Sequence, residues 1–238
     1  MPSLNLLYKR EIAINDAIHI VVPTVGEILQ DEDGYYGLIT LLTSMPIDLM
    51  CQLDEIGIDF TSITDYDLFL LLFSGLQTQD TSLVFGDLDL SGFQTAISKQ
   101  NGKIVLADAE NDIVIDRAIY GRIAATLRKI HHLEKNRRKP ANEEAKKYML
   151  ERARAKQKRR ANRVEDSQLE SLIISMVNTE QYKYNFESTL GLSIFQFNES
   201  VRQVIKKIDY DNRMHGVYAG TIDAKKLSQN DLTWLNCK

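Results

Sequence analysis

The hydrophobic pattern of the chain begins with two short β-favouring runs. Residues 4–14 and 18–22 are separated by the turn-rich break Asn15-Asp16-Ala17, and this arrangement predicts a β-hairpin. Thr24 is followed three residues later by Glu27, the pattern of a capping box, which predicts that a short helix begins there.

Helical spacing dominates the next part of the chain. Apolar residues recur every three or four positions from Tyr35 onward, and Pro46 opens another helical stretch that Gly57 ends. Thr64 then precedes a run over residues 65–76 that is apolar on nearly every side. We expect that helix to be buried in the middle of a domain.

The period changes from helical to alternating after residue 82. Four short runs are candidate strands, and Asn101-Gly102, a dipeptide suited to a tight hairpin turn, lies between two of them. The runs are residues 83–85, 93–97, 103–106 and 113–115. This pattern predicts a small antiparallel meander.

The second half of the chain reads as helical. Asp116 is expected to cap a helix through residue 130, and Asn142 to start a fresh helix after the interruption at Pro140. Residues 153–162 carry no apolar side chain larger than alanine, so that part must be solvated or covered by a partner. Amphipathic helices follow over residues 167–177 and 193–208, and residues 210–234 are expected to form a compact, turn-rich cap.

Together these patterns predict an α+β fold with three regions. Residues 1–127 form an N-terminal domain of hairpin, helices and small antiparallel meander. Residues 128–163 form a basic helical connector, and residues 164–238 form a helical C-terminal domain.

Charge sharpens this picture, because the net charge of −4 hides a polarised molecule. Residues 128–163 hold 15 Lys and Arg against 4 Asp and Glu, whereas residues 1–127 hold 6 against 19. A segregated basic stretch indicates an electrostatic contact surface for phosphate, for an anionic protein patch or for the protein's own acidic part. The residues with the densest positive charge are Lys156, Lys158, Arg159, Arg160 and Arg163.

The sequence leaves three roles open for the basic stretch. It is a solvated or partner-covered helix, a surface that binds an anionic protein, or a surface that binds nucleic acid. No aromatic residue lies between Tyr148 and Tyr182, so a stacking platform for single strands is missing. The acidic N-terminal part is also a plausible self-partner, which would make a head-to-tail homo-oligomer.

Catalytic and metal-binding patterns are missing from the sequence. The four histidines show no HxxxH or HExxH spacing, and the glycines form neither a GxGxxG nor a GxxxxGK[ST] motif. The adjacent pair His131 and His132 is expected to extend the basic surface, and Asp87 to Gly92 to form a turn rather than a calcium loop. We therefore expect no enzyme, no cofactor and no metal.

Two features place the chain by compartment. Its two cysteines, Cys51 and Cys237, fit neither a disulfide framework nor a zinc site. The first residues lack the pattern of a secretion signal, and the longest apolar run, residues 68–73, is far shorter than the ~20 residues needed to cross a bilayer. We expect a soluble intracellular protein without membrane contact.

Seven segments carry a resemblance to a known family. They are residues 20–28 (IVVPTVGEI), 56–60 (IGIDF), 65–69 (DYDLF), 142–148 (NEEAKKY), 189–197 (TLGLSIFQF), 216–223 (GVYAGTID) and 232–234 (LTW). With these segments, which extend over most of its length, the chain resembles small structural or assembly proteins of tailed-phage gene clusters in Gram-positive bacteria. Proteins of this kind are labelled tail assembly chaperone or baseplate-associated.

The resemblance implies a non-enzymatic role in tail morphogenesis. Its partners would be other phage tail proteins, such as the tape measure, hub or baseplate, and its location the host cytoplasm during assembly or the virion tail. The resemblance carries over no site residues. The alternative hypothesis is a nucleic-acid-binding accessory protein that uses residues 128–163.

Overall fold

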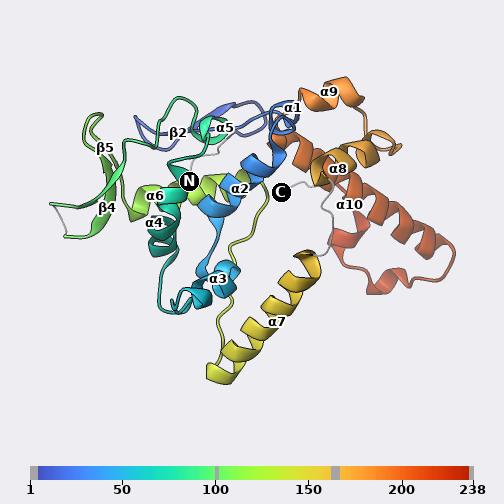
Figure 1. The fold of residues 1–238 in the computed structure, drawn as a ribbon. Helices are drawn as coiled ribbons and strands as arrows, with labels where there is room; N and C mark the ends of the chain where they lie inside the picture. The colour runs from blue at the N-terminus through green and yellow to red at the C-terminus, as the bar shows by residue number, and fades with distance from the viewer. Residues whose placement is uncertain (1–4, 100–101, 162–166, 236–238) are drawn as a thin grey trace.

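The computed structural model describes residues 5–99, 102–161 and 167–235, apart from the side chains of Arg160, Ala161 and Asn230 (Figure 1). Helices predominate, and the strands form two small antiparallel sheets. The order is a hairpin, a set of helices, a three-stranded sheet and then helices to the end of the described chain. The predicted α+β class is confirmed.

The N-terminal hairpin pairs β1 (Glu11–Ala13) with β2 (His19–Val21), with Ile12 opposite Ile20. The Asn15 side chain accepts hydrogen bonds from the amides of Ala17 and Ile18, which closes the turn where the sequence predicts it. Helix α1 (Val25–Ile28) follows and carries the predicted capping box.

A group of helices comes next. They are α2 (Glu32–Thr43), the 3-10 helix η1 (Pro46–Leu49), α3 (Met50–Glu55) and α4 (Asp65–Leu76). Helix α4 begins at the Thr64–Asp67 capping box, and it buries Tyr66, Phe69 and Phe73. Its predicted position in the core is confirmed, with Leu71 as an exposed exception.

The meander has three strands rather than four. Strands β3 (Gln94–Ile97), β4 (Ile104–Asp108) and β5 (Ile113–Ile115) pair in chain order, all antiparallel. The predicted strand over residues 83–85 is wrong, because Ser82–Phe85 form the short helix α5. That helix buries the adjacent residues Val84 and Phe85 together, whereas successive residues of a strand face opposite sides of the sheet. Asn101 of the predicted turn lies outside the described residues, and Gly102 has the left-handed φ of 67°.

Two helices carry the basic stretch. Helix α6 (Arg117–Ile130) is capped by Asp116, as predicted, and its buried face includes Tyr120, Ile123 and Leu127. Helix α7 (Glu143–Ala161) begins after Pro140, and the Asn142 side chain accepts a hydrogen bond from the Ala145 amide. Figure 1 shows α7 projecting from the body below α3.

The C-terminal part contains α8 (Gln168–Val177), α9 (Phe186–Leu190) and α10 (Ile194–Tyr218). The last helix ends ten residues beyond the predicted end at residue 208, so the start of the predicted cap is helical. Gly216 leaves room for the chain to fold back on the end of this helix, since a Cβ there would lie 2.6 Å from Cδ1 of Ile222. The 3-10 helices η2 (Ala224–Lys226) and η3 (Gln229–Leu232) complete the described chain.

The C-terminal helices share a core with the N-terminal half. Thr24 and Ser193 form an antiparallel bridge, and the Ile194 amide donates to the Pro23 carbonyl at 2.8 Å. Ile194 and Phe197 are fully buried in the same apolar cluster as the hairpin, α4 and α6. The predicted boundaries between residues 1–127, 128–163 and 164–238 stay a prediction, and this core extends across the outer two regions.

A second, smaller cluster lies beneath α7. Leu150 of α7 packs there with Ile47, Leu53, Phe60 and Leu68.

Within the described ranges, no helix is both long and apolar enough to span a membrane.

Candidate functional site

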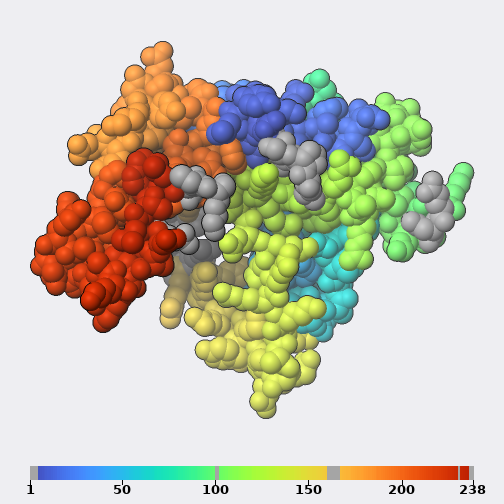
Figure 2. Space-filling view, turned by 180° about the vertical axis from the view of Figure 1, so that it is seen from behind, coloured from blue at the N-terminus to red at the C-terminus, as the bar shows by residue number. Residues whose placement is uncertain are grey.

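The basic stretch takes three forms in the structure: the end of α6, the strap (residues 133–140, which have no regular secondary structure) and α7. Seen from behind, the strap and the start of α7 form a lobe that projects from the body (Figure 2). This lobe lies against η1, the loop before α4 and the start of α4, which carry Asp48, Asp59 and Asp65.

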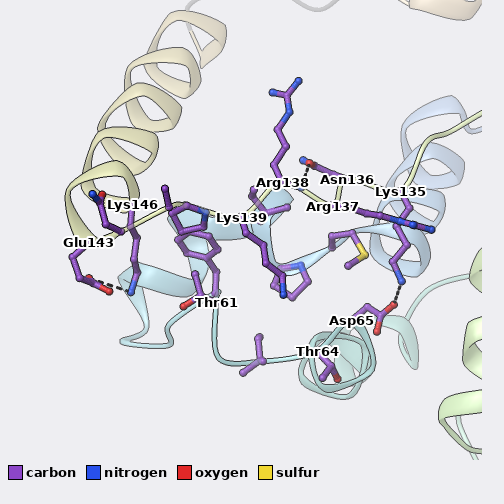
Figure 3. A pocket seen from close by; sticks show the side chains of 18 residues that line it. Thr61, Thr64, Asp65, Lys135, Asn136, Arg137, Arg138, Lys139, Glu143 and Lys146 are labelled. Atoms are coloured by element: carbon purple, nitrogen blue, oxygen red, sulfur yellow. Dashed lines mark hydrogen bonds and ion pairs between the residues drawn. The ribbon is translucent and has the colours of Figure 1, made fainter.

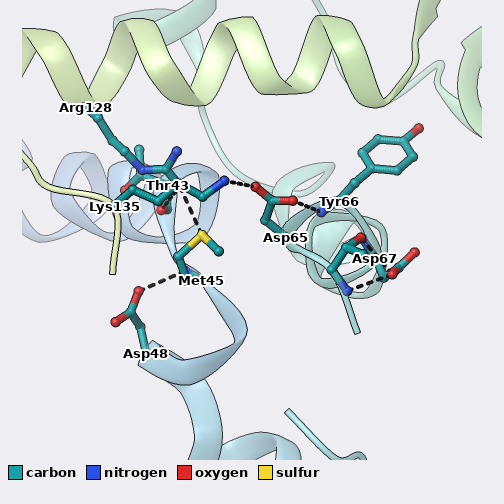
Figure 4. Close-up of polar contacts among 9 residues, drawn as sticks. Thr43, Met45, Asp48, Asp65, Tyr66, Asp67, Arg128 and Lys135 are labelled. Atoms are coloured by element: carbon teal, nitrogen blue, oxygen red, sulfur yellow. Dashed lines mark hydrogen bonds and ion pairs between the residues drawn. The ribbon is translucent and has the colours of Figure 1, made fainter. Parts of the chain in front are cut away.

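The strap is attached to the acidic part of the chain at its start. Lys135 Nζ lies 2.7 Å from Oδ2 of Asp65, and the Asn136 side chain donates to Asp48 at 2.7 Å. Just before the strap, the Arg128 guanidinium donates to the Thr43 carbonyl and contacts the sulfur of Met45 at 3.8 Å (Figure 4). These contacts fix the direction in which the chain leaves α6.

Two opposing effects act on the Asp65 carboxyl. Burial raises its pKa, whereas the hydrogen bond and the positive charge of Lys135 lower it, with a smaller contribution from the Tyr66 amide. The net result is a pKa below the ordinary value. The Asp65 carboxylate is therefore charged at neutral pH, and its contact with Lys135 ties the strap to α4.

Helix α7 is anchored by charge and by packing. Lys146 Nζ lies 2.7 Å from Oδ2 of Asp59, Arg154 forms an ion pair with Asp54, and Leu150 is buried between them along the helix. Hydrogen bonds from Lys146 and then Thr61 lower the pKa of Asp59 to about 2. This part of the basic stretch binds the chain's own acidic N-terminal part, one of the contacts the charge pattern predicts.

The outer end of α7 (residues 156–161) is different. Lys156, Lys158 and Arg159 are exposed, and in the part of the chain the structure describes they make no ion pair. Two predicted contact residues remain. The backbone of Arg160 belongs to α7, but its side chain is not among those the structure describes, and Arg163 lies outside the described residues. The structure thus brings three of the five predicted residues onto one exposed helical end.

An open hollow of about 710 Å³ lies between the strap and the body (Figure 3). Its floor is apolar and includes Pro46, Phe60 and Ile63, and its rim includes Arg137 and Lys139 of the strap. The sequence reasoning did not single out this site. The sequence feature that could have indicated it is the run Arg137-Arg138-Lys139 before Pro140. The apolar residues that form the floor below this run lie more than seventy residues earlier in the chain, so local spacing does not connect the two.

The histidine pair does not extend the basic surface as predicted. His131 packs against Tyr35, with its Nε2 2.9 Å from the Tyr35 hydroxyl, and burial with the neighbouring His132 lowers its pKa to about 4. It is therefore neutral at pH 7. His132 stacks on Phe195 and lies 3.4 Å from Glu199, so it contacts α10.

Other candidate chemistry resolves into local structure. Asp89 accepts hydrogen bonds from the amide and hydroxyl of Ser91, as expected of a turn. Cys51 is buried, and burial raises the pKa of its thiol. Among the residues that the structure describes, no group of three or more His, Cys, Asp or Glu is placed to hold a metal ion.

The C-terminal part of the chain is similar to a known domain. Residues 156–237 match a protein-family model described as YomV second domain, which belongs to a phage-derived family. The match covers about a third of the chain and begins inside α7. No curated protein and no solved structure matches the chain. This similarity is consistent with a phage protein, and the tail role stays a prediction.

Proposed function

We propose that the protein is a non-enzymatic component of phage tail assembly, or of a tail-like particle, that acts through protein–protein contacts at the outer end of α7. One observation carries this proposal. The first part of α7 is held to the body by Lys146, Leu150 and Arg154, while Lys156, Lys158 and Arg159 project without an ion pair in the described chain.

The chemistry of the outer end suits an electrostatic contact. Lys156 and Arg159 are three residues apart and so lie on the same side of the helix. The only apolar residue there is Ala161, so a partner gains little from apolar burial and much from opposite charge. The partner surface is therefore anionic, and its association is sensitive to salt.

One observation favours a protein over a single-stranded nucleic acid as the partner. The outer end offers no aromatic side chain on which a base could stack, since α7 has no aromatic residue after Tyr148. The matched phage-derived domain begins at Lys156 and contains the outer end. A tail protein that exposes carboxylates, such as the tape measure, the hub or a baseplate component, is the proposed partner.

The test is affinity capture of the tagged protein from cells that produce the particle, with and without nuclease. The wild type is compared with Lys156→Glu/Lys158→Glu/Arg159→Glu and with the control Lys9→Glu/Arg122→Glu/Lys129→Glu. The control makes the same charge change at exposed positions elsewhere.

We expect tail proteins to co-purify after nuclease treatment with the wild type and the control, and to be lost with the α7 variant. Loss of the partners on nuclease treatment, or retention of nucleic acid that the α7 variant abolishes, would support the nucleic-acid alternative instead. Equal capture by all three proteins would remove the outer end from the mechanism.

A further inference from the structure

The hollow beneath the strap combines an apolar floor with a charged rim. Its floor is apolar, with Phe60 and Ile47 buried from below and Ile63 partly exposed. Its rim is the strap, which crosses above the floor without hydrogen-bonded secondary structure. The hollow belongs to residues 45–65 and 135–146 and lies outside the matched range 156–237.

The acidic side chains around the hollow are ion-paired, whereas some of the basic ones are not. Of its two carboxylates, Asp65 pairs with Lys135 at 2.7 Å, and Glu143 lies 3.7 Å from Lys146. Arg137 and Lys139 are exposed and make no ion pair within the described ranges. Figure 3 shows Arg138 extending away from the other lining side chains. Lys146, whose Nζ lies 6.0 Å from the ring centre of Phe60, is already paired with Asp59, so Arg137 and Lys139 are the unpaired cations of the rim.

We propose that this hollow binds an acidic segment of a partner protein in an extended conformation. An apolar side chain of the segment packs on Ile63, the partly exposed side chain of the floor beside the buried Pro46 and Phe60, and flanking carboxylates pair with Arg137 and Lys139. A charged rim over an apolar floor selects a peptide that alternates the two properties, because each part alone gives only weak binding.

Charge complementarity and the floor together favour a peptide over a phosphate or a nucleic acid. A phosphate gains nothing from an apolar floor, and its charge would be met by an exposed rim alone. A base would need an exposed aromatic face. Phe60, the aromatic ring that lines the hollow, is 5% exposed and has Lys146 Nζ 6.0 Å from its centre.

This inference goes beyond the proposed function, because it concerns a different surface and a different kind of contact. The outer end of α7 offers charge without apolar area, whereas the hollow offers both. Variants in the strap leave Lys156, Lys158 and Arg159 unchanged, so the two proposals can fail separately.

The experiment screens a displayed library of random short peptides on the full-length protein. One variant, Arg137→Glu/Lys139→Glu, reverses the charge of the rim, and its control is Lys147→Glu/Arg152→Glu, with the same charge change on exposed positions of α7. A second variant, Ala141→Trp, fills the hollow without changing charge, and Ala155→Trp on the exposed surface of α7 is its control. Circular dichroism and thermal unfolding check each fold.

We expect the wild type and both controls to enrich peptides that carry an apolar residue flanked by Asp or Glu. A synthesised, fluorescent copy of the enriched peptide is expected to bind about tenfold or more weakly to each hollow variant. Should the rim variant fail to fold, Ala141→Trp and its control decide the matter.

Three results would overturn the proposal. They are enrichment of no acidic–apolar sequence on the wild type, equal binding of the enriched peptide to Ala141→Trp, and displacement of that peptide by oligo-dT or inorganic phosphate at matched ionic strength. A concentration-dependent dimer in sedimentation that both hollow variants abolish would identify a second copy of this chain as the occupant, and it would also replace the proposal.

Discussion

Lys146 and Asp59 join helix α7 to the loop before α4 across 87 residues of sequence, with Nζ and Oδ2 2.7 Å apart. The same ammonium lies 6.0 Å from the ring centre of Phe60. One lysine of the basic stretch is therefore used by the fold itself, at the edge of the apolar cluster that Leu150 enters.

This ion pair predicts a stability change at low pH. The pKa of Asp59 falls from its ordinary 3.8 to about 2 in the folded protein, chiefly through its hydrogen bond from Lys146. The stabilisation is present above pH ~4 and is lost as the pH falls towards ~2, because only then does the folded carboxylate take up a proton. Urea unfolding across this range is expected to show a shallower pH dependence for Asp59→Asn than for the wild type.

The matched control is Asp16→Asn, which removes an exposed carboxylate at the β1–β2 turn. It is expected to keep the wild-type pH dependence between pH ~4 and ~2. If Asp59→Asn and the wild type change in parallel over this window, the ion pair does not contribute to folding stability.

Leu150 is predicted to be the apolar anchor of α7. It is 8% exposed and packs on Leu53 and Phe60. Leu150→Ala is therefore expected to lower the free energy of unfolding by about 2 kcal/mol, the lower end of the range for a buried leucine, because Leu150 lies at the edge of its cluster. Hydrogen exchange should speed up across α7. Tyr148→Ala, at a 63% exposed neighbour, is expected to change stability by less than about 0.5 kcal/mol. Equal effects of the two variants would show that packing does not hold the helix.

Phe197 tests whether the first and last parts of the chain unfold together. It is fully buried in α10, within the cluster that contains Ile20 and Val25. Phe197→Ala is expected to cost about 3–5 kcal/mol and to speed hydrogen exchange in β2 and α1 as well as in α10. Phe186→Ala, at a half-exposed position of α9, is the control and is expected to cost less than about 1 kcal/mol. Two separate transitions, with β2 and α1 unaffected, would contradict a shared core.

His131 predicts a second pH effect, in a higher range. Its pKa is about 4 in the folded protein against 6.5 ordinarily, so the unfolded chain binds the extra proton between these values. Stability is complete above pH ~6.5 and falls by about 3 kcal/mol as the pH decreases to ~4, at ~1.4 kcal/mol per pKa unit.

Thermal unfolding of His131→Gln between pH 4 and 7 is expected to show a flatter profile than the wild type. His215→Gln, at an exposed position near the end of α10, should leave the profile unchanged. An unchanged slope for His131→Gln would mean that protonation of His131 is accommodated beside Tyr35.

The sequence by itself determined the local structure. The capping box at Thr24, the start of the helix after Thr64, the Asn15 turn and the Asp116 cap all form where the sequence predicts, because each depends on groups within a few residues of one another. The α+β class follows from the change of hydrophobic period, and so does most of the order of the elements.

Only the tertiary structure decided which charges are free and which apolar residues meet. Lys135, Lys146 and Arg154 are paired with aspartates 70 to 100 residues away. Lys156, Lys158 and Arg159, by contrast, make no ion pair among the described residues. Composition cannot separate these two groups, since their side chains have the same charge. Burial of His131 and the apolar floor below Arg137 likewise arise from contacts between distant segments, which local spacing does not encode.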